Sequence, residues 1–233
     1  MKMCTCNSNA YHSWYAKKQK TYCFKCSAYV DSESLGVHGD LCVENKPLEI
    51  PDFLDYPKRS DIIWPNITEG LATTDGHWYV SIIKGIRFLV LPVYRNSKMV
   101  FWTARNLDSN DPKYLSAHGS KKQYWLSDEK YPTGDLFIAE SIVDACYLSH
   151  LGQSVGLLGT SYNCSLDNWM KSAKRIIVCF DADPPGRIQG MLLARYLRDM
   201  DICKDIKILS LPDGTDPVDM KLDDLKTLVS ELE

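Results

Sequence analysis

The stretch Arg175–Gly186 reads RIIVCFDADPPG, and it decides the fold because an apolar run ends in two carboxylates and a helical pattern follows. An earlier stretch, Leu136–Ala145, reads LFIAESIVDA and repeats this order with a single carboxylate, Glu140. Short, β-branched apolar runs that are followed by helical patterns are typical of strands in a parallel βαβ sheet. We therefore expect Glu140 and the pair Asp181 and Asp183 to meet at the carboxyl edge of such a sheet.

These three carboxylates are expected to form a metal-binding bay. Residues at i and i+2 of a strand point to the same face, so Asp181 and Asp183 can hold one ion or bridge two. With Glu140, they would suit phosphoryl chemistry assisted by magnesium or manganese. The competing interpretation is that acidic residues at strand ends cap the next helix or face water. Downstream, the stretch LSLPDGTDPVDM places three more carboxylates in a turn, namely Asp213, Asp216 and Asp219. Asp213 and Asp216 are expected either to bind a further metal ion or to shape the turn after the strand.

This arrangement resembles the Toprim domain of DnaG-type and bacteriophage primases, whose pattern is a strand, Glu, a DA-containing helix, a later strand, DxD with a nearby Gly, and LPxGxDPxD. The matching residues are Glu140, Asp144, Ala145, Asp181, Asp183, Gly186, Leu211, Pro212, Asp213, Gly214, Asp216, Pro217 and Asp219. The family usually has Gly after the first Glu, where this chain has Ser141. Serine can also open a helix. Asp144 would either favour the helix amino terminus or reach the bay.

Composition restricts the class of protein without choosing a function. A chain of 233 residues with 45% apolar content can bury a substantial core. Lys84 and Arg87 interrupt the longest apolar stretch, so none reaches the roughly 18 residues needed to cross a membrane. Nine cysteines, an odd number without a signal-peptide pattern, indicate reduced thiols or metal ligands rather than a disulfide framework. We therefore expect a soluble, intracellular (cytoplasmic) protein.

The net charge of −3 hides a segregation of charge along the chain. Residues 1–26 carry five Lys and no acid, and residues 77–130 carry nine Lys or Arg against four acids. Residues 205–233 instead hold eight acids and three bases. A polyanionic partner would therefore meet the first two regions.

The amino-terminal region contains a candidate zinc site. Cys4, Cys6, His12, Cys23 and Cys26 fall within 23 residues, where little apolar sequence is available to form a core. Cys23 and Cys26 form a CxxC pair, and Cys4 and Cys6 are the favoured second pair. Cys6 with His12 is an alternative second pair, and the site could also be absent. A redox dithiol is the competing interpretation of the CxxC, but no thioredoxin-like strand and helix precede it.

Residues 4–26, CTCNSNAYHSWYAKKQKTYCFKC, also resemble the zinc-binding module of bacteriophage primases, in which the second cysteine pair reads CFxC after an aromatic residue. The resemblance implies that the module reads a short template sequence and delivers it to the polymerase domain. The candidate DNA contacts are His12, Trp14, Tyr15, Lys17, Lys18 and Lys20. Bases can stack on aromatic rings while lysines contact phosphates. The competing role for Trp14 is packing beneath the zinc.

The remaining sequence suggests how the chain is divided. Residues 46–72 are rich in proline and read as a linker after a zinc module at 1–45. Residues 73–133 alternate short apolar runs with turn-like breaks, which predicts a mixed β-rich subdomain. Residues 134–233 would be the Toprim subdomain. The expected fold class is thus α+β and α/β, with a small β zinc ribbon, a mixed β subdomain and a parallel central sheet flanked by helices.

Basic residues in the β-rich subdomain could line a cleft opposite the acidic bay and bind a nucleoside triphosphate or the template backbone. They are Arg87, Arg105, Lys113, Lys121 and Lys122. The string TARNLDSNDPKYLSAHG, residues 103–119, again resembles primases, in which an Arg after a strand and a KYL-type segment belong to the RNA polymerase domain. The resemblance implies catalytic roles for Arg105 and Lys113. For Lys121 and Lys122 a solvated face is the competing interpretation.

The expected function is that of a DNA primase, which makes short RNA primers on single-stranded DNA from ribonucleoside triphosphates with magnesium or manganese and a structural zinc. Glu140 could hold a metal or act as general base. No GxxxxGK[ST] phosphate loop is present, so a replicative helicase is expected to be a separate chain, in a bacterial host of a phage. Two alternatives stay open: a recombination-mediator-like zinc and Toprim protein that binds DNA without catalysis, and a Toprim metal-dependent nuclease.

Overall fold

The computed structural model describes residues 78–117, 123–159, 162 and 164–232, together with the backbone of three amino-terminal strands. These strands are β1 (His12–Tyr15), β2 (Lys20–Cys23) and β3 (Ala28–Asp31). They form an antiparallel sheet in the order β1-β2-β3. Cys4, Cys6 and Cys26, and the linker expected at 46–72, lie outside the described residues.

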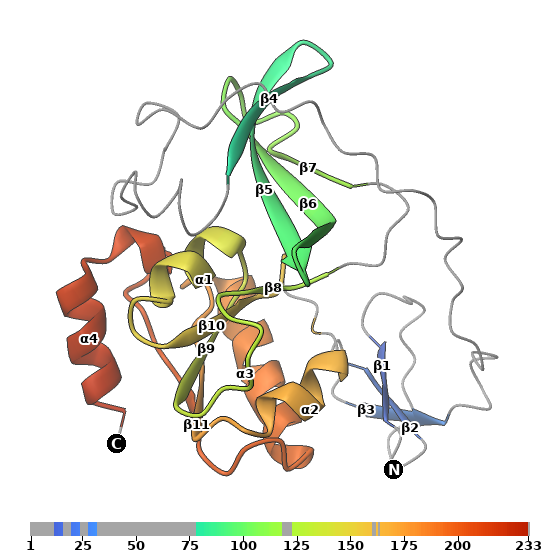
Figure 1. Ribbon diagram of the computed structural model, residues 1–233. Helices are drawn as coiled ribbons and strands as arrows, with labels where there is room; N and C mark the ends of the chain where they lie inside the picture. Colours follow the sequence, from blue (N-terminus) through green and yellow to red (C-terminus); the bar gives the residue numbers. More distant parts are fainter. Residues whose placement is uncertain are drawn as a thin grey trace.

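Residues 78–117 form a four-stranded antiparallel sheet in the order β4-β5-β6-β7. Its strands are β4 (Tyr79–Ile83), β5 (Ile86–Arg95), β6 (Lys98–Asn106) and β7 (Tyr114–Ser116). Both long hairpins turn through two residues with positive φ, Lys84 with Gly85 and Asn96 with Ser97. Two such residues are typical of tight hairpin turns whose twist matches that of the strands. The β-rich region is therefore a single antiparallel meander, at the top of Figure 1.

The second sheet has the order β12-β11-β9-β10-β8. Its strands are β8 (Trp125–Leu126), β9 (Asp135–Ala139), β10 (Gln153–Gly156), β11 (Arg175–Val178) and β12 (Ile206–Ile208). The four strands from β12 to β10 are parallel, as expected, whereas β8 pairs antiparallel with β10. β8 thus joins this sheet although it precedes the subdomain boundary expected near residue 133.

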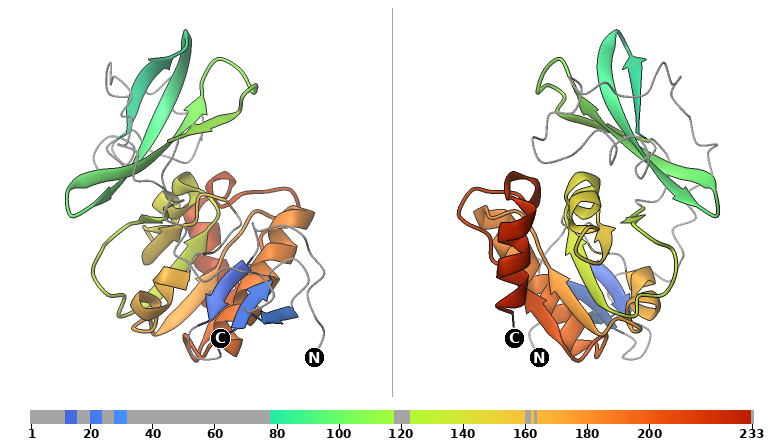
Figure 2. Two further views of the ribbon diagram at one scale, coloured as in Figure 1. Left: turned by 90° about the vertical axis from the view of Figure 1, so that its right-hand side faces the viewer. Right: turned by 60° about the vertical axis from the view of Figure 1, so that its left-hand side comes forward.

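Helices cover both faces of the second sheet (Figures 1 and 2). They are α1 (Ile142–Leu148), α2 (Asp167–Met170), α3 (Pro184–Asp199) and α4 (Leu222–Ser230), with short 3₁₀ turns η5 (Cys164–Leu166) and η6 (Pro217–Asp219). Side chains alternate along β9: Phe137 packs in the core with α1 and α4, and Leu136 packs in the core with α2 and α3. Because both faces are buried, the strands read as continuous apolar runs.

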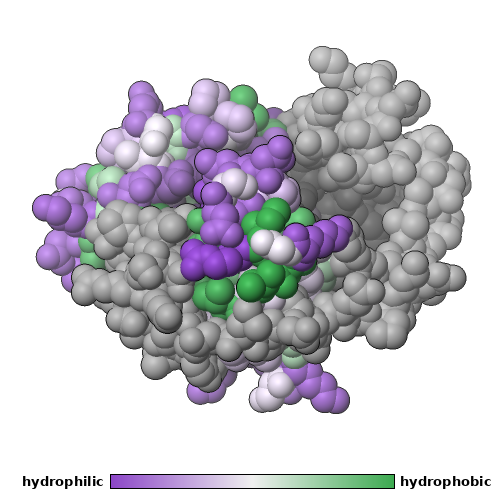
Figure 3. Space-filling model, turned by 90° about the horizontal axis from the view of Figure 1, so that it is seen from above, coloured by the Kyte–Doolittle hydropathy of each residue, from purple (hydrophilic) through white to green (hydrophobic). Residues whose placement is uncertain are grey.

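The surface of the described residues is mostly hydrophilic when the molecule is viewed from above, with an apolar patch near the centre (Figure 3). Ile82 is a large apolar side chain with substantial exposure, at 55%. Within residues 78–117, 123–159, 162 and 164–232, none of the helices is long and apolar enough to cross a bilayer.

An ion pair joins the starts of two neighbouring strands of the second sheet. Arg175 of β11 lies opposite Asp135 of β9, and its Nε donates a hydrogen bond of 3.1 Å to Asp135 Oδ1 while Nη2 donates to Oδ2. Both side chains are partly buried, at 22% and 29% exposure. Bidentate ion pairs of this kind are stronger than ion pairs with a single hydrogen bond at the surface.

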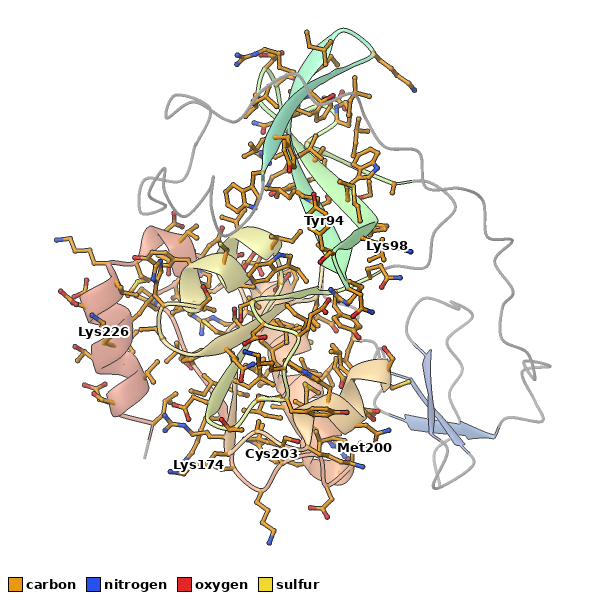
Figure 4. The ribbon with its side chains drawn as sticks, in the orientation of Figure 1. Tyr94, Lys98, Lys174, Met200, Cys203 and Lys226 are labelled. Carbon is orange, nitrogen blue, oxygen red and sulfur yellow. The ribbon has the colours of Figure 1, made fainter. Side chains whose placement is uncertain are left out.

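We expect Asp135→Asn to lower the free energy of unfolding by about 1–2 kcal/mol, because one charged hydrogen bond of the pair is lost. Urea unfolding measures this change. The matched control is Asp223→Asn on α4, whose partner Lys226 projects outward (Figure 4) and whose side chain is 91% exposed. The control should change stability by less than about 0.5 kcal/mol. Equal effects of the two substitutions would contradict the prediction.

Candidate active site

The carboxyl edge of the second sheet brings together Glu140 and Asp181. β9 and β11 are parallel and pair Ile138 with Val178. The chain leaves both strands at the same edge, with Glu140 after β9 and Asp181 after β11. Asp216 arrives from the loop after β12. These three carboxylates line one cavity of about 520 Å³, together with the buried Asp144 of α1.

A glycine at the start of α3 allows the carboxylates to lie this close. A Cβ atom added at Gly186 would be 2.3 Å from the backbone oxygen of Asp181 and 2.8 Å from Glu140 Oε1. It would also be 3.0 Å from Asp183 Oδ1. No other residue type fits here without movement of the backbone, because real Cβ atoms do not approach oxygen to 2.3 Å. The packing of α3 against the strand ends therefore depends on this glycine.

Two of the expected acidic residues make local hydrogen bonds at helix starts. Asp183 is the N-cap of α3, and its Oδ1 accepts a hydrogen bond of 2.7 Å from the backbone of Gly186. Ser141 is the N-cap of α1, and its hydroxyl accepts from the backbone of Asp144 and donates to the carboxylate of Asp144. Asp183 thus has the capping role named as the competing interpretation, and it still raises the pKa of Glu140 through its charge.

Burial and mutual repulsion raise the pKa values of the carboxyl groups in this bay. The pKa of Glu140 is raised to about 8, first by burial and then by the charges of Asp181 and Asp183. The pKa of Asp181 is raised to about 6 by burial and by neighbouring carboxylates that include Asp216. Burial also raises the pKa of Asp144 to about 7. The bay therefore gathers carboxyl groups in a place where solvent stabilises their charged forms poorly.

The bay fits divalent cations. Glu140 Oε1 and Asp181 Oδ1 are buried and have no hydrogen-bond partner in the described part of the chain. Buried oxygens of this kind normally have a partner, and a cation would supply one while offsetting the repulsion. Within the described ranges, no group of three or more His, Cys, Asp or Glu side chains forms a preformed metal cluster. Magnesium is commonly held by only one or two carboxylates and keeps several waters, so this donor set suits it.

The opposite wall of the cavity comes from the antiparallel sheet. Its lining residues are Leu91, Phe101, Thr103, Lys113, Tyr114 and Ser116, while α1 contributes Val143 and the loop after β10 contributes Leu158 and Gly159. Lys113 lowers the pKa of Asp181 through its positive charge. Among the described residues that line the cavity, Lys113 is the one cation. The site therefore joins an acidic edge, a lysine and a wall in which apolar and hydroxyl-bearing side chains are mixed.

The other basic candidates lie outside the set of cavity-lining residues. Arg105 lies over the ring of Tyr114, at 5.1 Å from the centroid, and its Nη2 donates a hydrogen bond of 3.0 Å to Asn110. Arg87 forms an ion pair with Asp108 at 3.1 Å. Lys121 and Lys122 are outside the described residues. Arg105 thus supports the wall at Tyr114, and the pair of Arg87 with Asp108 is half exposed.

The acidic residues of the turn after β12 lie in two different environments. Asp216 lines the cavity, and its pKa is raised by burial and by Asp219. Asp213 instead pairs with Arg187 of α3 at 2.6 Å, and its side chain is 98% exposed. The structure therefore brings Asp216, but not Asp213, into the bay.

The amino-terminal candidates cannot be placed at the level of side chains. The described backbone includes His12, Trp14 and Tyr15 in β1 and Lys20 and Cys23 in β2. Lys17 and Lys18 lie outside the described residues, as do Cys4, Cys6 and Cys26.

Sequence reasoning missed the hydroxyl-bearing residues Thr103 and Ser116 and the ring of Tyr114 in the cavity wall. The alternation of side chains along the two strands could have indicated that these residues share a face. Residues at positions 101, 103 and 105 of one strand, and 114 and 116 of the next, share a face when the strands pair.

Comparisons with known proteins support the similarity to primases. No family model matches the chain. A DNA primase of Clostridium acetobutylicum is 31% identical over 145 residues, which cover 55% of this chain and 23% of that protein. The chain thus spans about a quarter of the length of the curated relative that it matches.

Solved structures of primases share the fold. The primase fragment of the bacteriophage T7 primase-helicase protein has a TM-score of 0.57 at 16% identity and covers 100% of this chain and 98% of that one. A DnaG primase catalytic domain bound to single-stranded DNA has a TM-score of 0.52 at 20% identity, over 62% of this chain and 51% of that one. The Escherichia coli primase catalytic core also has a TM-score of 0.52 at 20% identity, over 70% of this chain and 60% of that one. In fold, therefore, the chain groups with the DnaG-type primases and the bacteriophage T7 primase, and its sequence is similar to a DNA primase over 55% of its length.

Proposed function

We propose that the chain is a DNA primase that makes short RNA primers on single-stranded DNA for replication. The observation that carries this proposal is the bay at the carboxyl edge, where buried oxygens of Glu140 and Asp181 have no hydrogen-bond partner among the described residues and share one cavity with Lys113. A cation-binding acidic edge beside a lysine suits a triphosphate substrate. The primase fold and the sequence similarity support the same activity.

The residues of the bay have distinct proposed roles. Glu140, Asp181 and Asp183 would hold magnesium or manganese, with Asp216 as a further ligand. When bound, the ion supplies Lewis acidity that favours ionisation of an attacking 3′-hydroxyl and offsets charge on the triphosphate. Lys113 binds the triphosphate as a mobile point charge. Glu140 serves as general base if it is not a ligand.

The remaining proposals concern the amino-terminal module and its partners. A structural zinc would be held by Cys4, Cys6, Cys23 and Cys26, or with His12 in place of one cysteine. His12, Trp14, Tyr15, Lys17, Lys18 and Lys20 would contact the template. Arg87, Lys121 and Lys122 would contribute to nucleotide binding and Arg105 to catalysis, whereas Asp213 forms an ion pair with Arg187 and would lie outside the proposed metal site. The replicative helicase would be a separate chain.

The proposed function is tested by incubating the purified chain with ribonucleotides, magnesium or manganese and single-stranded DNA of mixed sequence. Wild type should make short RNA, and Asp181→Asn should reduce the yield by roughly 100-fold, because it removes a negative charge that would hold the metal ion. The matched control is Asp224→Asn on the exposed acidic side of α4, which should retain full activity.

Other outcomes distinguish the alternatives. Degradation of the DNA by wild type but not by Asp181→Asn would favour a nuclease. Equal DNA binding by all three proteins without chemistry would favour a DNA-binding module and would overturn the proposal.

A further inference from the structure

One wall of the cavity is a ladder of side chains on a single face of the antiparallel sheet. Thr103 of β6 lies opposite Ser116 of β7 and opposite Leu91 of β5. Partners that lie directly opposite in an antiparallel pair project to the same face. All three residues line the cavity that also contains Glu140 and Asp181. The hydroxyl groups of Thr103 and Ser116 therefore face the acidic edge across the cavity.

The hydrogen bonds of this hydroxyl pair leave only acceptors toward the cavity. Thr103 Oγ1 donates its proton to the backbone oxygen of Leu115 at 3.1 Å. Ser116 Oγ donates its proton to Thr103 Oγ1 at 3.3 Å. Each hydroxyl has one proton and two lone pairs, so lone pairs remain on Ser116 after both protons are used. In this arrangement Ser116 presents lone pairs to the cavity and accepts a hydrogen bond from a ligand group that donates one.

The surroundings of the pair restrict the kind of ligand further. Phe101 and Leu91 are almost fully buried beside it, and Leu158 lines the same cavity. The acceptors of the pair and its apolar neighbours favour an uncharged group that donates hydrogen bonds over an anion at this position. A sugar fits, since its C–H faces can contact apolar side chains while its hydroxyls donate. The charged end of the same ligand can then reach Lys113 and the carboxylate bay.

Resting on the primase function proposed above, we propose that the pair of Thr103 and Ser116 accepts a hydrogen bond from the 2′-hydroxyl of the incoming ribonucleoside triphosphate. The pair is thereby a specificity determinant that selects ribonucleotides over 2′-deoxyribonucleotides. A pocket that hydrogen-bonds a substrate hydroxyl rejects the analogue without it, because the polar groups of the pocket are then left without a partner. The DNA template has no 2′-hydroxyl and gains nothing from this pair.

The test is extension of a short RNA primer on a DNA template by one nucleotide, with ATP or 2′-deoxyATP. The measured quantity is the ratio of kcat/KM for the two substrates. Ser116→Ala should lower the ratio about tenfold, the value of one ordinary hydrogen bond. Thr103→Val should lower it similarly, and Thr103→Ser, which keeps the hydroxyl, should restore it. Ser230→Ala removes an exposed hydroxyl on α4 and should leave the ratio unchanged.

Calorimetric titration of ATP and 2′-deoxyATP with magnesium separates this proposal from the proposed function. If wild type extends no primer, the primase function fails, but tighter binding of ATP that is lost in Ser116→Ala would still support the sugar contact. A discrimination ratio within twofold of wild type in Ser116→Ala overturns the proposal. Equal losses for both nucleotides in Thr103→Val and Thr103→Ser would likewise overturn it, by showing that Thr103 only supports the strand.

Discussion

Glu140→Gln should reduce primer synthesis by roughly 1000-fold and at the same time make the metal-free protein more stable at pH 8, because the charge that we propose for catalysis is buried beside other carboxylates. Loss of activity follows because glutamine offers a neutral oxygen to a cation and cannot act as a base. Stability rises because the carboxylate has a buried oxygen without a hydrogen-bond partner in the described part of the chain and repels Asp181 and Asp183. An amide of nearly the same shape removes that repulsion.

The pH dependence of this stabilisation follows from the pKa of Glu140. The pKa is raised from its ordinary 4.5 to about 8 in the folded protein, so folding favours the protonated carboxyl. Stability from that protonated form is fully present below the ordinary pKa and is lost as pH rises toward 8. Glutamine imitates the protonated form at every pH. The gain from Glu140→Gln should therefore be small at pH 5 and on the order of 2 kcal/mol at pH 8.

Urea unfolding in a chelator at pH 5 and pH 8 measures this gain, and Glu231→Gln on the exposed carboxyl-terminal turn is the control. Magnesium should stabilise wild type at pH 8 and should stabilise Glu140→Gln much less, since the ion binds the charged form. A gain of the same size at both pH values would contradict the assigned role of charge. A loss of stability at pH 8 would contradict it as well.

Local sequence patterns were sufficient to predict the parallel sheet and the acidic residues at its carboxyl edge. The runs before Glu140 and Asp181 form β9 and β11, and these strands are neighbours. Short buried strands followed by helices have few alternative arrangements, because crossover connections between parallel strands are right-handed and the helices must cover both faces of the sheet. The carboxylates at the strand ends then meet as a consequence of topology.

The features that could not be predicted from the sequence depend on contacts between residues that are distant along the chain. β8 joins the second sheet by pairing Trp125 with Gly156, and a two-residue strand has no periodicity to detect. Asp213 pairs with Arg187, a choice set by the position of α3 rather than by the LPxGxDPxD pattern. Thr103 and Ser116 reach the cavity because one sheet faces the edge of another, which no local pattern specifies.

Gly186→Ala should reduce primer synthesis by about 100-fold or more, although it adds one methyl group, because displacement of reacting groups by about 1 Å carries a cost of this size. The new Cβ would be 2.3 Å from the backbone oxygen of Asp181 and 2.8 Å from Glu140 Oε1. The first of these atoms belongs to the backbone and cannot rotate away. The amino terminus of α3 must therefore move, and the cap from Asp183 to Gly186 is lost with it.

The second glycine of the same helix provides the matched control for this prediction. A Cβ atom at Gly190 would contact Val178 Cγ1 at 3.6 Å and Phe180 Cβ at 3.7 Å, which are ordinary packing distances. Gly190→Ala should therefore retain activity and gain up to about 1 kcal/mol of stability from its higher helix propensity. Gly186→Ala should instead lose about 2–3 kcal/mol in urea unfolding. Since both changes add one methyl to α3, equal activities of the two variants would show that close approach at Gly186 does not position the carboxylates.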